Sequence, residues 1–185
     1  MITLASKRET KPLIIAIYGH KNSGKTRLIE YLTRNLVEKG YKIATIKHIH
    51  HDDFEIDIQG KDTWRHRKAG ATTVIGISRK KVVIFEETPM KDLKQNLYRA
   101  LTYITKNTNP DIIFLEGFHN VTREDENIQK IILIKDLSDL ESLMITQIRN
   151  IIGLFPQENI NISQQNIRTF KNKEEILNEI LCMLK

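Results

Sequence analysis

The stretch GHKNSGKT, Gly19–Thr26, decides how the rest of this sequence is interpreted. It matches the phosphate-binding loop (P-loop) pattern, in which glycine, four residues and a second glycine are followed by lysine and then serine or threonine. The loop lies between the apolar run LIIAIY and a segment with helical periodicity, which is the context that the pattern requires. Glycines allow a tight turn, so successive backbone N–H groups can converge on phosphate oxygens at the start of the helix. The sequence therefore predicts a nucleotide-binding loop.

Each part of this loop has a predicted chemical role. Lys25 is expected to neutralise the β- and γ-phosphates and to act in catalysis. Thr26 offers a hydroxyl to Mg²⁺, which prefers octahedral oxygen ligands shared with the phosphates. The residues predicted to bind the nucleotide are Gly19, His20, Lys21, Asn22, Ser23, Gly24, Lys25 and Thr26.

A second acidic group is expected at the end of another buried strand, where P-loop proteins hold Mg²⁺ or its water shell. The apolar run of residues 112–115 ends at Glu116. Because this run reads as a parallel strand, Glu116 should emerge at the same sheet edge as the P-loop. We therefore predict that Glu116 and Thr26 hold the metal.

A polar connection rich in histidine and aspartate, KHIHHDDFEIDIQGKD, covers residues 47–62. Histidine with aspartate can bind zinc or manganese, which is one interpretation, but no recognised ligand spacing is met. The preferred interpretation is contact with anionic substrate groups, while Asp57 or Asp62 orients a water molecule for catalysis or holds Mg²⁺. The residues assigned to substrate or phosphate contact are Lys47, His48, His50, His51, Gly60, Lys61 and Arg65.

Length and composition limit the class of protein. A chain of 185 residues suffices for one domain, and we expect a single nucleotide-binding domain over residues 1–185. The net charge of +6 indicates anionic partners, but the basic clusters WRHRK and SRKK lack interleaved stacking aromatics, so nucleic acid is a less favoured partner. The single cysteine, Cys182, cannot form an intrachain disulfide, and no apolar run is long enough to span a membrane. A cytoplasmic protein is expected.

Apolar runs and helical patterns alternate along the chain. Buried strands are predicted over residues 13–18, 41–47, 111–118, 130–135 and 150–155, with amphipathic helices after the P-loop, after Pro89 and at the C-terminus. The β-rich runs 72–78 and 81–87 predict a hairpin or a tight crossover. This order favours the α/β three-layer fold of P-loop NTPases, with a mostly parallel sheet, helices on both faces and the nucleotide at the carboxyl ends of the strands.

The segments GHKNSGKT, TIKHIHHDDFEIDIQGKDT, RKAGAT and IIFLEGF occur in an order that resembles the molybdopterin-guanine dinucleotide biosynthesis protein B (MobB) family. The resemblance places the family's phosphate loop on Gly19–Thr26, its histidine loop on Lys47–Asp62 and its second acid on Glu116. It implies a homodimeric accessory protein that binds GTP and hydrolyses it slowly, with the Mg²⁺ predicted above at Thr26 and Glu116. Such a protein would assist a MobA-type guanylyltransferase in attaching GMP to molybdopterin.

Two other functions remain open on the residues alone. A P-loop small-molecule kinase would use the same loop, although such enzymes often close an arginine-bearing lid and no arginine-rich lid is evident. A nucleic-acid binder with a nucleotide switch would need an exposed basic or aromatic surface. The residues also leave GTP and ATP both open as the preferred nucleotide.

Overall fold

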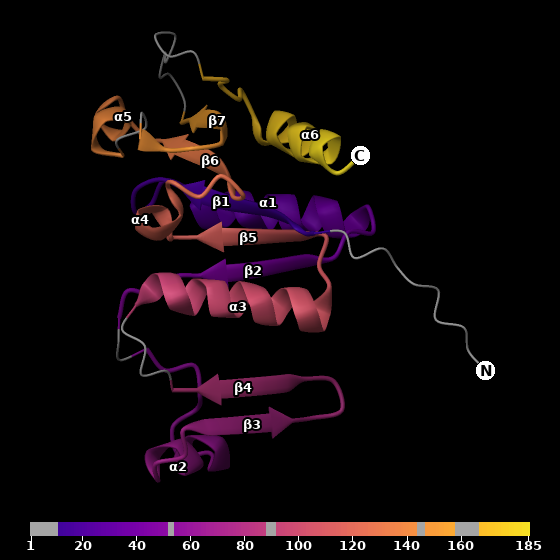
Figure 1. The fold of residues 1–185 in the computed structure, drawn as a ribbon, viewed down its shortest axis with the longest axis vertical. Helices are drawn as coiled ribbons and strands as arrows, with labels where there is room; N and C mark the ends of the chain where they lie inside the picture. The colour runs from indigo at the N-terminus through magenta and orange to yellow at the C-terminus, as the bar shows by residue number, and fades with distance from the viewer. Residues whose placement is uncertain (1–10, 52–53, 88–91, 144–146, 158–166) are drawn as a thin grey trace, which may run out of the picture. The chain divides into compact units, whose positions relative to one another are not determined.

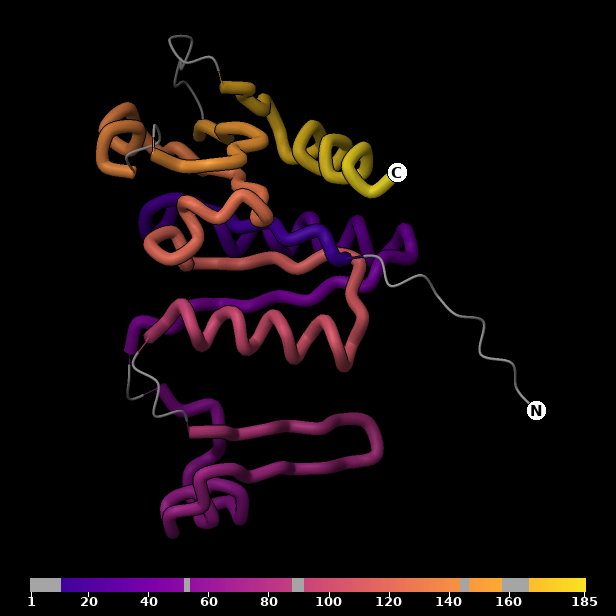
Figure 2. The backbone as a smooth tube through the Cα atoms, viewed as in Figure 1, coloured from indigo at the N-terminus to yellow at the C-terminus, as the bar shows by residue number. Residues whose placement is uncertain are grey.

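A computed structural model describes residues 11–51, 54–87, 92–143, 147–157 and 167–185. The chain forms two compact units: unit 1 comprises residues 1–48 and 97–185, and unit 2 comprises residues 49–96. In the tube of Figure 2, unit 1 runs from indigo to violet and resumes from rose to yellow. The expectation of one domain over residues 1–185 stays a prediction.

Unit 1 is built on a five-stranded sheet with the strand order β2-β5-β1-β6-β7 (Figure 1). The strands are β1 (Leu13–Tyr18), β2 (Ile43–Lys47), β5 (Ile112–Glu116), β6 (Gln129–Ile134) and β7 (Ile151–Pro156). All four pairings are parallel, as near-continuous apolar runs predict. The mostly parallel sheet expected from the sequence is therefore confirmed.

One face of this sheet packs against α1 (Lys25–Glu38) and α6 (Lys173–Met183). Both helices are amphipathic and bury their apolar stripes in one core with Ile15 and Ile17 of β1. The Asn172 side chain caps α6 by accepting a hydrogen bond from the backbone N–H of Glu175 at 2.9 Å. This layer covers the sheet beside the P-loop.

Helices also lie on the opposite face, as predicted. Tyr18 follows Ile17 in β1 and therefore points to the other side of the sheet. Its hydroxyl lies 2.6 Å from the Thr122 hydroxyl of the one-turn helix α4 (His119–Thr122). The longer helix α3 (Leu93–Thr108) buries Leu97 and Leu101, and a short helix, α5 (Ser138–Ser142), follows β6.

None of the described helices is long and apolar enough to cross a membrane.

The chain between β7 and α6 returns to the sheet in a close backbone contact. The backbone N–H of Leu154 donates to the Arg168 carbonyl, and the N–H of Phe170 donates to the Leu154 carbonyl, both at 2.8 Å. The Phe170 ring is fully buried against Gly153. The absence of a side chain at Gly153 is what lets the ring lie on the strand.

Unit 2 contains the helix α2 (Asp62–Lys68) and the strands β3 (Thr73–Ile77) and β4 (Val82–Glu86). The strands pair antiparallel, so the hairpin predicted as one of two alternatives is the one observed. In the turn, the Ser78 hydroxyl oxygen accepts the Lys81 backbone N–H at 3.0 Å. One hairpin face holds Val74 opposite Phe85, and the Arg67 guanidinium of α2 lies 5.1 Å from the Phe85 ring centre.

The buried Tyr18 hydroxyl predicts a loss of stability at alkaline pH. Burial raises the pKa of Tyr18 from 10.0 to about 12. The unfolded chain therefore ionises first, and this stability is present below pH 10 and lost as pH rises towards 12. We expect Tyr18 to contribute a loss of about 1.4 kcal/mol between pH 9 and pH 11.

Urea unfolding of wild type and Tyr18→Phe at both pH values measures this loss, because the difference between the two proteins should change by that amount. Tyr103→Phe, on the exposed surface of α3, is the matched control. A difference that stays constant with pH would contradict the assignment to Tyr18.

Candidate nucleotide-binding site

The P-loop follows β1 and ends in the first turn of α1. Gly19 and Gly24 have φ angles of +139° and +90°, a region that favours glycine. At Gly19, an added Cβ would lie 2.5 Å from the Ser23 Oγ and 2.9 Å from the Leu133 carbonyl oxygen. Glycine at this position is therefore required by both backbone conformation and space.

Lys25 folds back over the loop. Its Nζ donates to the carbonyl oxygens of Gly19 at 2.8 Å and His20 at 2.6 Å. Burial lowers the pKa of Lys25, an effect that the Glu116 carboxylate opposes and the neighbouring Lys47 ammonium reinforces. The loop thus holds a half-buried cation at the N-terminus of a helix, where anions are favoured.

Thr26, Glu116 and Lys47 form one side of the site. The Thr26 hydroxyl donates to Glu116 Oε1 at 2.9 Å, and Lys47 Nζ lies 3.2 Å from the same oxygen. Glu116 comes from the end of β5 and Lys47 from the end of β2, so the parallel register brings them together. A hydroxyl and a carboxylate side by side supply the oxygen ligands that Mg²⁺ prefers, so these residues fit the predicted metal.

The turn after β5 positions His48 beside this group. The His48 backbone N–H donates to the Glu116 carbonyl at 2.8 Å, and the imidazole Nδ1 lies 3.1 Å from the Gly117 carbonyl oxygen. Its ring also packs on Phe118, with 5.5 Å between ring centres. Gly117 has a φ of +88°, and an added Cβ would lie 3.2 Å from the His48 Cβ. The structure therefore places Lys47 and His48 next to Glu116.

The other side of the P-loop contacts residues that the sequence did not suggest. His20 Nε2 lies 2.8 Å from Ser142 Oγ and 3.3 Å from Asp139 Oδ1. Gln157 Nε2 donates to the Ser23 carbonyl oxygen at 3.1 Å. Asp139 follows β6 and Gln157 follows β7. The signal in the sequence that could have pointed to them is this position after a predicted strand.

A groove of about 650 Å³ begins beside Thr26 and Glu116 and runs along α1. Its apolar lining includes Ile29 and Val37, and Arg34 lies among the charged residues along it. The groove shares its lining with the candidate site through Thr26, Lys47 and Glu116. A site of this volume is typical of small-ligand pockets.

The remaining predicted residues belong to unit 2. Asp57 Oδ1 accepts hydrogen bonds from the Ile58 backbone N–H at 2.9 Å and the Thr63 hydroxyl at 3.0 Å, so this carboxylate organises the approach to α2. The roles predicted for residues of this unit stay predictions: His50, His51, Asp57, Gly60, Lys61, Asp62 and Arg65. Asp52 and Asp53 of the same connection lie outside the described residues.

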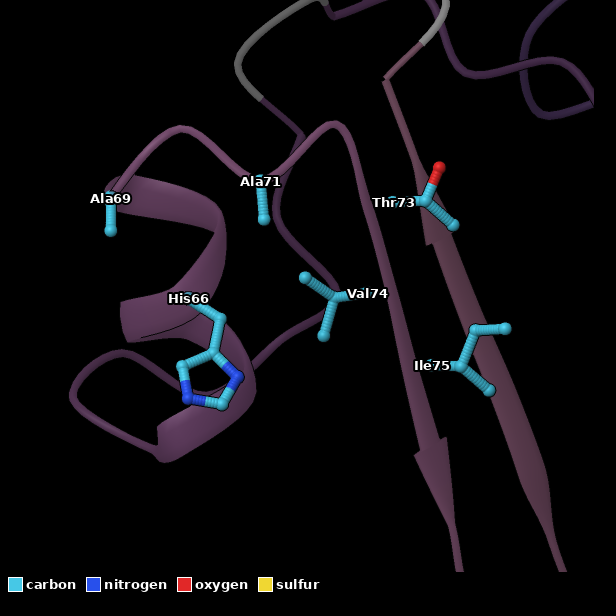
Figure 3. A pocket seen from close by; sticks show the side chains of 6 residues that line it. All are labelled: His66, Ala69, Ala71, Thr73, Val74 and Ile75. Carbon is cyan, nitrogen blue, oxygen red and sulfur yellow. The ribbon is translucent and has the colours of Figure 1, made fainter.

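Unit 2 also has a surface pocket of about 530 Å³ formed by α2, the turn after it and β3 (Figure 3). The residues that line it are His66, Ala69, Ala71, Thr73, Val74 and Ile75. Within the described ranges of the chain, no three histidine, cysteine, aspartate or glutamate side chains gather closely enough to hold a metal ion.

Comparison with known proteins places the chain in a family. The family described as MobB, molybdopterin guanine dinucleotide synthesis protein B, matches residues 14–156. The molybdopterin-guanine dinucleotide biosynthesis adapter protein of Haemophilus influenzae is 35% identical over 124 residues, which are 65% of this chain and 62% of that protein. A putative adapter protein of Methanocaldococcus jannaschii is 37% identical over 123 residues, 66% of this chain and 47% of that protein. The aligned part thus covers less than two thirds of either relative.

Solved structures agree with the fold. The crystal structure of Bacillus subtilis MobB superposes with a TM-score of 0.71 at 23% identity, covering 94% of this chain and 98% of that one. A MobB homologue from Bacillus stearothermophilus gives a TM-score of 0.67 at 17% identity, covering 92% and 97%. At this level of identity the likeness shows the fold alone. Because the MobB family match covers residues 14–156, most of its length, the chain belongs to the MobB family.

Proposed function

We propose that this protein is a GTP-binding accessory protein, an adapter of molybdopterin guanine dinucleotide biosynthesis, with slow Mg²⁺-dependent hydrolysis of the nucleotide. Three kinds of support converge: membership of the MobB family, relatives described as adapter proteins of this pathway, and the P-loop geometry. The observation that carries nucleotide binding is the half-buried Lys25 held over the loop beside the Thr26–Glu116 pair.

The site suits binding better than rapid hydrolysis. Lys25 supplies positive charge for the phosphates, and Thr26 and Glu116 would hold Mg²⁺. A bound Mg²⁺ would neutralise charge that develops on the phosphate oxygens. The Glu116 carboxylate already accepts the Thr26 hydroxyl and pairs with the Lys47 ammonium, so its oxygens are engaged in these contacts instead of positioned to activate water. Slow turnover is the expected consequence.

Titration calorimetry with GTP, ATP and GDP, each with and without Mg²⁺, tests this proposal. We expect Glu116→Gln to weaken GTP binding more with Mg²⁺ than with EDTA, by about tenfold, because the substitution removes the charge beside the metal. Asp111→Asn is the matched control, since Asp111 precedes the same strand and its carboxylate accepts the Lys42 backbone N–H at 2.7 Å. Equal losses with and without the metal would make Glu116 a structural residue.

We further propose that the protein acts in the cytoplasm with a MobA-type guanylyltransferase and molybdopterin. The adapter names of the relatives support a role beside another protein. Titrating purified guanylyltransferase into this protein, with and without GTP and molybdopterin, is the direct measurement. A small-molecule kinase would instead consume ATP rapidly with an acceptor and would show no binding of the guanylyltransferase.

A homodimer is part of the proposal, and the hairpin of unit 2 supports it. Ile75 pairs with Ile84 and Ile77 with Val82, so these four side chains lie on one face. Between 42% and 78% of each side chain is exposed within the single chain. A two-stranded hairpin with such a face is marginal alone, and association with a second copy would bury it.

We therefore expect Ile77→Asp to shift the protein from dimer to monomer. A buried, unpaired carboxylate in the interface would be strongly unfavourable. Light scattering after size exclusion gives the mass directly. Val37→Asp, at a similarly exposed apolar position of α1, is the control and should leave the mass unchanged. A dimer that persists in Ile77→Asp would exclude this face as the interface.

A further inference from the structure

The P-loop is anchored from the β6–β7 side by the two side chains His20 and Gln157. Gln157 follows β7, and its backbone N–H donates to the Ile134 carbonyl of β6 at 2.8 Å, which continues the ladder between the two strands. Its side-chain amide then donates to the Ser23 carbonyl at 3.1 Å. The end of the sheet is thereby tied to the phosphate loop.

The second anchor, His20, is a residue of the loop itself. His20 Nε2 is hydrogen-bonded to the Ser142 Oγ at 2.8 Å and lies 3.3 Å from Asp139 Oδ1. The Ser142 hydroxyl donates to the Asp139 carbonyl at 3.3 Å, which leaves its oxygen to accept from the same Nε2. Asp139 is buried and accepts the Lys135 backbone N–H at 2.6 Å, so the Ser142 partner of His20 is itself bonded to a fixed residue.

The effect of the Gln157 anchor on the loop follows from peptide geometry. In a trans peptide, the C=O and the following N–H point in opposite directions. When Gln157 holds the Ser23 carbonyl, the Gly24 N–H is aimed away from Gln157. Because Gly24 precedes the first residue of α1, this N–H is one of the orphan donors at the helix start that bind anions.

We propose that His20 and Gln157 are positioning residues that hold the P-loop in its phosphate-binding shape from the β6–β7 side. This inference rests on the proposed nucleotide function. Neither side chain needs to touch the phosphates. They act through the loop backbone, by reducing the conformational freedom that ligand binding would otherwise have to remove.

Two variants remove the anchors with little change in shape. Gln157→Glu is isosteric but cannot donate to the Ser23 carbonyl when ionised, and His20→Phe keeps a ring without a donor. His20→Gln retains a donor and is the conservative variant that should restore function. Two measurements follow: hydrogen exchange of the loop amides in the ligand-free protein, and calorimetric affinity for GTP and for inorganic triphosphate.

We expect loop amides to exchange about fivefold faster in Gln157→Glu and His20→Phe, and affinity for both GTP and inorganic triphosphate to fall about fivefold, since one hydrogen bond is lost in each. His20→Gln should resemble the wild type. Unchanged loop exchange and unchanged affinity, or a lower melting temperature with unchanged affinity, would overturn the proposal. Wild-type protein that binds neither ligand would instead refute the nucleotide function, and the exchange rates would still decide whether the anchors hold the loop.

Discussion

Replacing Lys25 by alanine is expected to lower the affinity for GTP by at least about tenfold and to leave the fold intact. The Lys25 ammonium is half-buried over the loop, and burial already lowers its pKa. A bound triphosphate would stabilise the charged form of Lys25, which burial disfavours. A charge-assisted hydrogen bond of this kind contributes about 1.5–3 kcal/mol, which corresponds to a loss of roughly ten- to more than a hundredfold.

Calorimetry with GTP and Mg²⁺ measures the loss, and circular dichroism checks the fold. Lys21→Ala is the matched control, because Lys21 is an exposed lysine of the same loop whose backbone N–H the substitution retains. We expect this control to change the affinity by less than about threefold, as typical of an exposed charge. If Lys25→Ala bound GTP as tightly as wild type, the P-loop assignment would be wrong.

Gly153→Ala is expected to destabilise unit 1 by about 3 kcal/mol. The new Cβ would lie 2.3 Å from the Phe170 Cε2 and 2.8 Å from its Cδ2, far inside van der Waals contact. Phe170 is completely buried in the core shared by α1 and α6, so its ring has little room to move aside. Overpacking of a dense core costs about 1–3 kcal/mol and sometimes more.

Urea unfolding of four proteins tests this contact: wild type, Gly153→Ala, Phe170→Leu and the double variant. A smaller residue at 170 should relieve part of the clash, so the two substitutions should be non-additive. Gly76→Ala provides the control in unit 2, because an added Cβ there meets nothing nearer than the Thr63 Cγ2 at 3.6 Å. Strict additivity would show that the ring does not limit residue 153.

Local patterns in the sequence predict much of the fold and part of the site. The apolar runs give the buried strands because both sheet faces are covered, and the P-loop spacing gives the turn into α1. Glu116 was found because an apolar run that ends in an acid is a local signal. The contact between Glu116 and Thr26 follows because β5, which ends at Glu116, is the parallel neighbour of β1, which leads into the P-loop.

Other features depend on contacts between distant residues and had no local signal. The insertion of β5 between β2 and β1 cannot be read from either run alone. The one-turn helix α4 is too short for a period, and its Thr122 is held by the hydroxyl of Tyr18. His20 and Asp139 lie far apart in the sequence, so only the folded sheet reveals that they meet.

The hydrogen bond from the His48 N–H to the Glu116 carbonyl has a mechanical consequence. His48 is the last residue of unit 1 before the chain enters unit 2. The peptide that follows β2 is therefore coupled, through one 2.8 Å bond, to the residue that faces Thr26. A displacement of the Glu116 backbone would therefore stretch or break the bond that holds the first peptide after β2.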